Sequence, residues 1–244
     1  MKKKLVCVLA CRNQGGRLYG KPLQNIDVKK KIRVIDFLIN RIKKIKSISN
    51  IVLAISESID NQEYINISRK HSLKFIKGNE IDVLQRLILG GKILQATDIF
   101  RVTSESPFIY NDNKIINSAW EYHKKNNIDF SYLDENFVDG CNFEIISMKA
   151  LIQSHKKGKK RHKSELCSLF IRENLNKFKI KKIDTPKFLI RRDIRLTIDY
   201  PEDLIICREI YKKFKNKNLN EIIKFISKNK YLKNMCKKII INEK

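Results

Sequence analysis

LVCVLACRNQGGRLYGK, residues 5–21, joins an unbroken apolar run to a polar loop that carries glycines and cations. An apolar run without polar alternation is typical of a strand that is buried on both faces of a sheet. Residues 34–46 follow with apolar side chains at helical spacing, namely Ile35, Leu38, Ile39, Ile42 and Ile45. This part of the chain is therefore predicted to form a strand, a loop and a helix.

The same alternation continues to about residue 125. Further strands are predicted at 51–56, 73–77 and 98–103, and further helices near 61–71, 80–95 and 113–125, the last capped by Asp112 or Asn113. Repeated βα units predict an α/β fold with a mostly parallel central sheet and helices on both faces. Such sheets bind ligands beyond the carboxyl ends of their strands. The loops at 12–21, 57–60 and 104–110 are expected to share that edge.

From about residue 128 the pattern changes, with strand-like segments at 129–133, 142–148 and 177–184 and a basic loop at 155–163. We expect residues 128–190 to form an α+β insertion that covers the sheet or pairs with it. Residues 194–198 are predicted as one more core strand, and Pro201 suits the first turn of a helix. Residues 215–244 are basic and amphipathic and are expected to be helical. The chain, residues 1–244, is predicted to be a single domain.

The charge of the chain is strongly positive. With 244 residues, it can bury roughly 70–75% of the surface that its unfolded form would expose, so it needs no disulfide or metal to fold. It carries 52 Lys and Arg residues against 26 Asp and Glu, a formal net charge of +26, which attracts polyanions. Because the excess is lysine spread along the whole chain, we predict no nucleic-acid partner.

The cysteines and the apolar segments indicate a cytoplasmic protein. The six cysteines form no Cys-x-x-Cys pair and have no histidine at zinc spacing, so we expect a reduced, intracellular chain. The apolar stretch near the N-terminus is short for a signal peptide and runs directly into Arg12. No segment reaches the roughly 18 apolar residues of a membrane span, so we predict no membrane insertion.

The loop at 10–21 has the composition of a phosphate site. Its three glycines allow backbone N–H groups to surround an anion, and Arg12, Arg17 and Lys21 supply positive charge. It matches neither the Walker pattern nor the G-x-G-x-x-G pattern of dinucleotide sites. From the loop alone, a phosphate site and an ordinary glycine turn stay equally open.

Five blocks of sequence follow one another in a characteristic order, from the loop after the first strand (residues 12–21, the first loop) to about residue 204. They are Arg-x-x-Gly-x-Arg-Leu-x-Gly-Lys-Pro-Leu (12–23), Gly-x-x-x-Asp-Val-Leu-x-Arg (78–86), Arg-Val-Thr-Ser-Glu-Ser-Pro-Phe-Ile (101–109), Asp-Gly-Cys-Asn-Phe-Glu-Ile (139–145) and Arg-Leu-Thr-Ile-Asp-Tyr-Pro-Glu-Asp-Leu (195–204). In this order they resemble the bacterial cytidylyltransferases that activate Kdo and other acidic sugars, and still more the spore-coat polysaccharide SpsF-like branch.

The resemblance implies a Rossmann-like nucleotide-diphospho-sugar transferase fold and a nucleotidyltransferase activity. The enzyme would transfer CMP from CTP to a sugar, a keto-acid sugar or a sugar or polyol phosphate and release pyrophosphate, in surface polysaccharide or glycan biosynthesis. Its partners would be CTP and a small-molecule acceptor. A homodimer contact through residues 128–190 would match similar proteins.

The resemblance also implies a nucleotide site centred on the first loop. Its residues would be Ala10, Cys11, Arg12, Gln14, Gly15, Gly16, Arg17, Lys21, Asp82 and Arg86. Arg12, Arg17 and Lys21 would grip the triphosphate. Asp82 and Arg86 are one helical turn apart, so an ordinary ion pair between them stays open as an alternative.

Glu105 and Asp199 would hold Mg²⁺ or Mn²⁺ in the same scheme, and Arg12, Lys21, Glu105 and Asp199 would be the catalytic residues. Mg²⁺ prefers one or two carboxylates together with phosphate oxygens and waters. An acceptor oxygen displaces pyrophosphate in line, so positioning and electrostatics carry most of the rate. Both carboxylates are expected at the ends of neighbouring core strands. A helix cap for Asp199 and a solvated loop acid for Glu105 stay open as alternatives.

The acceptor residues implied by the resemblance are Asp139, Glu144, Glu165 and Arg195. Turn chemistry is the alternative for Asp139 and Glu144, and an exposed strand-end charge is the alternative for Arg195. Two departures from the family pattern, Leu166 in place of His and Tyr19 in place of Pro, predict an unusual acceptor or weakened catalysis. Glu105 stands in place of Asp, and its longer side chain can still reach a metal but shifts the geometry of the site.

Two other functions stay open at this point. The loop could serve a different nucleoside triphosphate, because residues that grip phosphates do not read the base. A catalytically weakened, basic binding module would instead use its charge on RNA or an anionic glycan and bind with steep salt dependence. No aromatic RNA-binding signature accompanies the basic run at 155–163.

Overall fold

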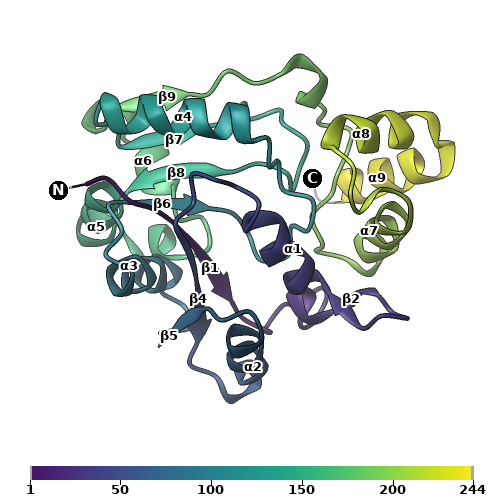
Figure 1. Cartoon of the computed structure of the whole chain (residues 1–244), viewed down its shortest axis with the longest axis horizontal. Helices are drawn as coiled ribbons and strands as arrows, with labels where there is room; N and C mark the ends of the chain where they lie inside the picture. The colour runs from purple at the N-terminus through teal and green to yellow at the C-terminus, as the bar shows by residue number, and fades with distance from the viewer. Residues whose placement is uncertain (1, 243–244) are drawn as a thin grey trace.

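A seven-stranded sheet forms the centre of the computed structural model, which describes residues 2–242 (Figure 1). The strands lie in the order β5 (Lys74–Gly78), β4 (Asn50–Ser56), β1 (Leu5–Cys11), β6 (Asp98–Arg101), β8 (Glu144–Ser147), β7 (Phe130–Tyr132) and β9 (Ile180–Lys182). Neighbours are parallel except at β8, which is antiparallel to both β6 and β7. The mostly parallel sheet confirms the α/β prediction.

Both faces of the sheet are covered, as the apolar run of β1 predicts. Leu5, Cys7 and Leu9 belong to one buried cluster, and Val6 and Val8 belong to a second on the other face. The first cluster includes residues of helices α1 (Val34–Ile42), α2 (Glu63–Lys70), α4 (Asn113–Lys125), α7 (Pro201–Phe214), α8 (Leu219–Lys228) and α9 (Lys230–Asn242). The second includes residues of helices α3 (Val83–Ile93), α5 (Met148–Lys157) and α6 (Leu169–Arg172).

Local sequence signals explain where several helices begin. The Asp112 side chain accepts hydrogen bonds from the backbone N–H groups of Lys114 and Ile115, which confirms the predicted cap of α4. Pro201 occupies the first turn of α7, where it needs no hydrogen-bond partner. A short hairpin of β2 (Asn25–Asp27) and β3 (Ile32–Arg33) precedes α1.

Residues 128–190 pair with the sheet and also cover part of one of its faces, through α5 and α6. Their strands β7, β8 and β9 extend the sheet beyond β6. The basic segment at 155–163 is not a plain loop, because α5 continues to Lys157 and a 3₁₀ turn occupies Lys160–Lys163. After residue 215 the described chain forms α8 and α9, beside α7 at one side of the sheet in Figure 1. Residues 243–244 of the predicted helical segment lie outside the described residues.

The prediction of a core strand at 194–198 is wrong. Ile194, Leu196 and Ile198 are buried as a strand pattern requires, but the segment does not join the sheet. Its backbone bonds to two loops instead. The Leu196 N–H donates to the Asp139 carbonyl at 2.8 Å, and the Ile198 N–H donates to the Glu105 carbonyl at 3.1 Å. The segment therefore joins the two loops that carry Asp139 and Glu105.

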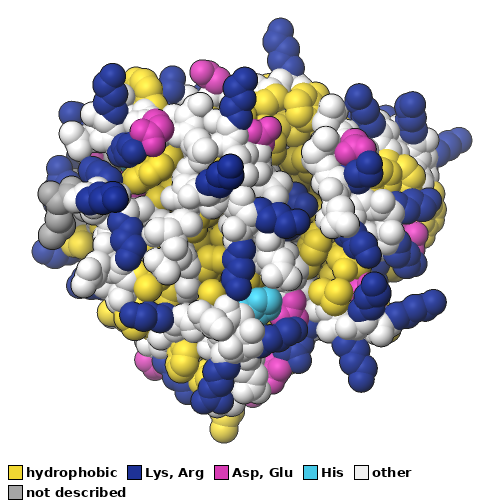
Figure 2. All heavy atoms as spheres, in the orientation of Figure 1, with side chains coloured by type: hydrophobic (Ala, Val, Ile, Leu, Met, Phe, Trp, Pro, Cys, Tyr) yellow, Lys and Arg dark blue, Asp and Glu magenta, His cyan; other side chains and the backbone are white. Residues whose placement is uncertain are grey.

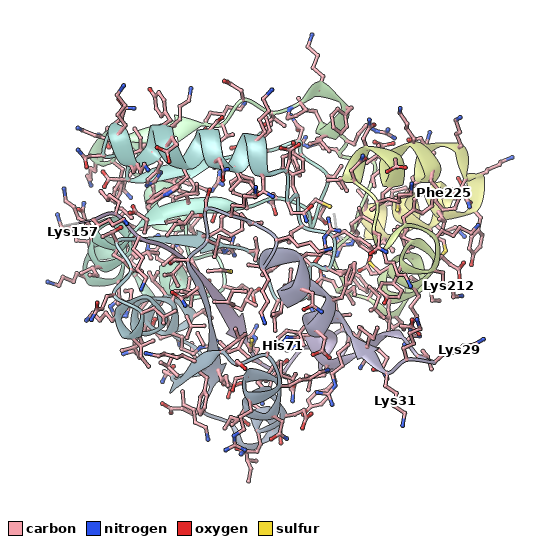
Figure 3. The ribbon with its side chains drawn as sticks, viewed as in Figure 1. Lys29, Lys31, His71, Lys157, Lys212 and Phe225 are labelled. Atoms are coloured by element: carbon pink, nitrogen blue, oxygen red, sulfur yellow. The ribbon has the colours of Figure 1, made fainter. Side chains whose placement is uncertain are left out.

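The positive charge is dispersed over the surface. Lysine and arginine side chains are scattered across the face shown in Figure 2, between apolar and neutral areas. Figure 3 shows Lys29 and Lys31 projecting from the β2–β3 hairpin, with Lys157 at a separate edge of the molecule. The dispersed charge follows from lysines that are spread along the sequence.

All six cysteines are buried and free. Within the part of the chain that the structure describes, none of the helices has the length and apolar character needed to cross a membrane.

Candidate active site

A pocket of about 500 Å³ opens beyond the carboxyl ends of β1 and β6. The loop after β1, the start of α3 and the residues that follow β6 line one part of it. Segments near residues 139–142 and 165–167, together with Thr197 and Asp199, line the rest. This is the edge at which α/β sheets bind ligands, so the pocket lies where the sequence predicts a site.

The backbone of the first loop is held from several directions. The Gly20 N–H donates to the Asn13 carbonyl at 2.9 Å, and Gly20 has a φ of 59°, a conformation that favours glycine. The Asn13 N–H donates to the side-chain oxygen of Asn61 at 2.8 Å, and the Tyr64 hydroxyl donates to the Arg12 carbonyl at 3.1 Å. The segment after β4 therefore holds the first loop rather than lining the pocket.

Asp199 is surrounded by cations. The Lys21 Nζ lies 2.5 Å from the Asp199 Oδ1, and the Arg17 Nη2 lies 3.7 Å from the same oxygen. Arg195 bonds the other carboxylate oxygen. Burial alone would raise the pKa of Asp199, but Lys21, Arg195 and Arg17 outweigh it and hold the pKa below its ordinary value. Asp199 is therefore an ionised carboxylate at neutral pH.

Glu105 lies next to Asp199 because of the backbone bond between Ile198 and Glu105. Burial raises the pKa of the Glu105 carboxyl, and the charge of Asp199 raises it further, although Lys21 opposes both. Two neighbouring carboxylates with Lys21 and Arg17 beside them fit the small protein contribution that Mg²⁺ requires. Among residues 2–242, no three His, Cys, Asp or Glu side chains converge as a metal group, so the remaining ligands would be phosphate oxygens and waters.

Replacing Glu105 with glutamine is expected to stabilise the metal-free protein. A carboxyl whose pKa is raised on folding contributes stability below its ordinary pKa of about 4.3 and loses it as the pH rises through the raised pKa. At about pH 7.5 the melting temperature of Glu105→Gln should exceed that of the wild type by about 2–4 °C, the change that about 1 kcal/mol produces in a domain of this size.

Thermal unfolding in the presence of a chelator, at about pH 4.5 and pH 7.5, measures this difference. The rise should shrink at the lower pH, because a larger share of the wild-type carboxyl is then protonated. Glu121→Gln is the control, since Glu121 forms an exposed pair with Lys124 on α4. A Glu105→Gln protein that melts at or below the wild-type temperature at pH 7.5 would contradict the expectation.

Arg195 lies beneath the pocket and joins three carboxylates. Its side chain is 3% exposed and bonds Asp139 at 2.8 Å, Asp203 at 2.9 Å and Asp199. Asp203 in turn accepts the backbone N–H groups of Asp199 and Tyr200. Arg195 is therefore neither an exposed strand-end charge nor part of the pocket wall; it positions Asp139 and Asp199, which do line the pocket.

Asp139 reaches Arg195 through a turn that only glycine permits. Gly140 has a φ of 77°, and a Cβ atom there would clash with the backbone nitrogen of Thr197. The turn alternative proposed for Asp139 is thus correct for the backbone, while its side chain still lines the pocket.

Glu144 is held by a second ion-pair network. Arg101 lies 3.2 Å from one of its carboxylate oxygens, while Arg172 and the Ser168 hydroxyl bond the other at 2.9 and 2.8 Å. Burial would raise the pKa of Glu144, but Arg101 and Arg172 outweigh it and lower the pKa. The Arg101 Nη2 also donates to the Glu165 carbonyl at 2.9 Å, so this network fixes the wall that carries Glu165.

Most of the residues that the sequence assigns to the site line this single pocket. They are Ala10, Arg12, Gln14, Gly15, Gly16, Arg17, Lys21, Arg86, Glu105, Asp139, Glu165 and Asp199. Four assigned residues are outside the wall, namely Cys11, Asp82, Glu144 and Arg195. The assignments of Glu144 and Arg195 to the acceptor are thus corrected: their side chains lie in the ion-pair networks behind the wall.

The assignments of Cys11 and Asp82 to the nucleotide also need correction. Cys11 follows Ala10 in a strand, so its side chain points to the opposite face and is fully buried in the core. Asp82 caps α3 by accepting the Gln85 N–H at 2.8 Å, and its other oxygen lies 2.7 Å from the His155 Nε2. The position of Arg86 does not depend on an ion pair with Asp82, because its guanidinium donates to the carbonyls of Cys11 and Ala54.

Sequence reasoning missed three residues that support the site. Arg101 fixes the wall at Glu165, Asp203 holds Arg195 from behind, and the Tyr200 hydroxyl accepts a hydrogen bond from Arg17 at 2.9 Å. The Arg17 guanidinium also lies over the Tyr200 ring, 4.7 Å from its centre. A charge at the end of a buried strand was a usable signal for Arg101, whereas the Arg17–Tyr200 contact joins residues far apart in the sequence.

The sequence of the chain matches a known protein family and two known proteins. A family model for cytidylyltransferases matches residues 6–239. An uncharacterized protein of Methanocaldococcus jannaschii is 28% identical over 234 residues, which are 95% of this chain and 94% of that protein. The spore coat polysaccharide biosynthesis protein SpsF of Bacillus subtilis is 22% identical over 233 residues, covering 92% of this chain and 95% of SpsF.

Solved structures show the same fold. A cytidylyltransferase from Leptospira borgpetersenii superposes with a TM-score of 0.84 at 23% identity, covering 95% of this chain and 97% of that one. A CMP:2-keto-3-deoxy-manno-octonic acid synthetase in complex with CTP has a TM-score of 0.63 at 13% identity, covering 86% and 99%. These likenesses confirm the predicted Rossmann-like nucleotide-diphospho-sugar transferase fold.

Proposed function

This chain belongs to the cytidylyltransferase family, and we propose that it transfers CMP from CTP to a sugar-like acceptor and releases pyrophosphate. The family makes it a nucleotidyltransferase. The observation that carries the proposal is the convergence of Arg12, Arg17 and Lys21 with Glu105 and Asp199 on one pocket. Cations and carboxylates meet there in the combination that phosphoryl-type transfer needs.

The side chains of the pocket can position both reactants. Arg17 and Lys21 would bind the triphosphate and stabilise the charge that develops as the bond between the α-phosphorus and its bridging oxygen breaks. An acceptor oxygen attacks the α-phosphorus from the opposite side, and pyrophosphate leaves with the electron pair of the broken bond. The fixed backbone of the first loop keeps these cations in place.

Glu105 and Asp199 are the residues that would hold Mg²⁺ or Mn²⁺. A bound divalent cation would supply charge neutralisation for the phosphate oxygens. The raised pKa of Glu105 supports this proposal, since a carboxylate that costs stability when ionised in the metal-free pocket is suited to a cation. Lys21 would then exchange its bond to Asp199 for a phosphate oxygen.

The acceptor would bind at the wall formed by Asp139 and Glu165, beyond the triphosphate. We propose a sugar, a keto-acid sugar or a sugar or polyol phosphate, destined for surface polysaccharide or another glycan. The name of the Bacillus subtilis relative supports this destination. Association of two chains through residues 128–190 is part of the same proposal.

Purified protein tests the reaction directly. With CTP, Mg²⁺ and a panel of keto-acid sugars and of sugar and polyol phosphates, we expect pyrophosphate to form with at least one acceptor. CTP near 100 times its Kd should add about 2.7 kcal/mol of stability, a rise of roughly 5–10 °C in melting temperature. UTP, ATP and GTP should give smaller rises.

Two results would count against the proposal. The proposed reaction would be contradicted if CTP caused no thermal shift and no acceptor led to pyrophosphate. Equal shifts with all four nucleotides would remove the preference for CTP and favour another nucleoside triphosphate. A basic binding module would instead bind polyanions in a strongly salt-dependent manner and show no metal-dependent affinity for CTP.

A further inference from the structure

An exposed ion pair joins two residues that line the pocket. The Arg12 Nη2 lies 2.7 Å from the Glu165 Oε2, and the two side chains are 39% and 69% exposed. Arg12 comes from the first loop, whereas Glu165 comes from the opposite wall, just before α6. The pair therefore joins a cation of the proposed triphosphate site to a carboxylate of the proposed acceptor wall.

Both ends of the pair are anchored through their backbones. The Arg12 carbonyl accepts a hydrogen bond from the Tyr64 hydroxyl, and the Glu165 carbonyl accepts one from Arg101. Arg101 is itself held by the buried carboxylate of Glu144. Because the backbones are fixed, the pair can break by side-chain rotation alone, without movement of either wall.

Arg12 is expected to bind a triphosphate more strongly than it binds Glu165. An exposed ion pair between two flexible side chains contributes little, because water screens it and both side chains lose rotational freedom. A triphosphate carries several negative charges and offers the guanidinium paired oxygens, which make stronger hydrogen bonds. Nucleotide binding should thus remove Arg12 from Glu165.

Resting on the proposed function, we infer that Glu165 is a competing counter-ion for Arg12, released when the triphosphate binds. The released carboxylate then accepts hydrogen bonds from hydroxyl groups of the acceptor. The nucleotide consequently binds first. The acceptor binds after it, when the Glu165 carboxylate is free to accept hydrogen bonds.

The neighbour of Glu165 indicates which part of the acceptor meets this wall. Leu166 lines the same pocket with 58% of its surface exposed. An acidic side chain beside an exposed apolar one suits a carbohydrate ring, whose hydroxyl edge donates hydrogen bonds while its C–H face covers apolar surface. The region that contacts Glu165 is therefore a hydroxyl-bearing part of the acceptor and not its phosphate or carboxylate.

Removing the charge of Glu165 tests the competition without knowledge of the acceptor. In Glu165→Gln, the Kd for CTP, measured by calorimetry at low salt, should fall about two- to five-fold, because Arg12 no longer has a charged partner to leave. Inorganic tripolyphosphate should show the same gain, since the effect concerns phosphate charge and not the base. The gain should be largely lost at about 0.5 M salt.

Two further variants separate this exchange from a general change in charge. Glu209→Gln removes an equal charge from an exposed pair with Lys212 on α7 and should leave both affinities unchanged. In an Arg12→Met background, Glu165→Gln should give no gain.

The outcomes distinguish the inference from the function on which it rests. If the wild type binds CTP but Glu165→Gln binds it equally or more weakly, the inference is overturned and the proposed function stands. An equal gain in the Arg12→Met background overturns it as well. A wild type that binds neither CTP nor tripolyphosphate removes both.

Discussion

Asp199→Asn is expected to lower kcat for pyrophosphate release by roughly 10²–10³-fold, the effect of removing one group that stabilises transition-state charge. The asparagine keeps the size of the side chain but loses the charge that would hold a divalent cation beside the α-phosphate. The fold should survive, because the start of α7 is held by the side chain of Asp203 and not by that of Asp199.

Measurements of CTP affinity separate a loss of catalysis in this variant from a loss of nucleotide binding. Lys21 lies 2.5 Å from Asp199, so the variant should bind CTP in the absence of metal at least as tightly as the wild type. Asp193→Asn is the matched control, since Asp193 also pairs with an arginine, Arg191, and does not line the pocket. A kcat within about three-fold of the wild type, at saturating Mg²⁺, would rule out a metal-binding role for Asp199.

The fold was predictable because its signals are local. The unbroken apolar run of β1 required packing on both faces, and the βα order placed the first loop at the ligand edge. The error at 194–198 has a physical cause. Alternating burial of Ile194, Leu196 and Ile198 shows that the segment is extended, but it does not show which backbone the segment bonds to. Here the partners are loops.

The site was predictable at the first loop, which follows the end of β1, while Glu105, Asp139, Glu165 and Asp199 were assigned from the resemblance to a family. It was less so where ion pairs between distant residues decide which way a side chain points. Glu144 is buried and paired with Arg101 and Arg172, and it does not line the pocket. Asp82 is paired with His155, which lies on a helix that the sequence did not suggest. The orientation of Cys11 could have been predicted, because side chains alternate along a strand and Cys11 therefore points to the face opposite that of Ala10.

Arg195→Met is expected to destabilise the protein by about 3–5 kcal/mol, the usual cost of removing one partner from a buried ion pair. The guanidinium compensates Asp203, which is buried with 1% of its surface exposed, as well as Asp139 and Asp199. Methionine fills similar space but leaves the Asp203 carboxylate without its guanidinium. Urea unfolding at neutral pH measures the loss.

A buried arginine elsewhere in the chain provides the comparison. Arg41 is 5% exposed and donates to the Ile109 carbonyl and the Asn111 side chain, which are uncharged. Arg41→Met should therefore cost about 1–3 kcal/mol, less than Arg195→Met. Adding Asp203→Asn to Arg195→Met should recover part of the stability, because the charge that lost its partner is then removed.

Arg195 should also have an effect on the reaction that stability alone does not explain. Since it fixes one oxygen of Asp199, Arg195→Met should raise the Mg²⁺ concentration needed for half-maximal activity, while Arg41→Met should not. Arg195→Lys should restore part of both properties, because it keeps the charge but cannot bond three carboxylates in the same planar geometry. If Arg195→Met lost no more stability than Arg41→Met and needed no more Mg²⁺, Arg195 would not position Asp199, and the contacts with Lys21 and Arg17 would have to hold that carboxylate in the pocket.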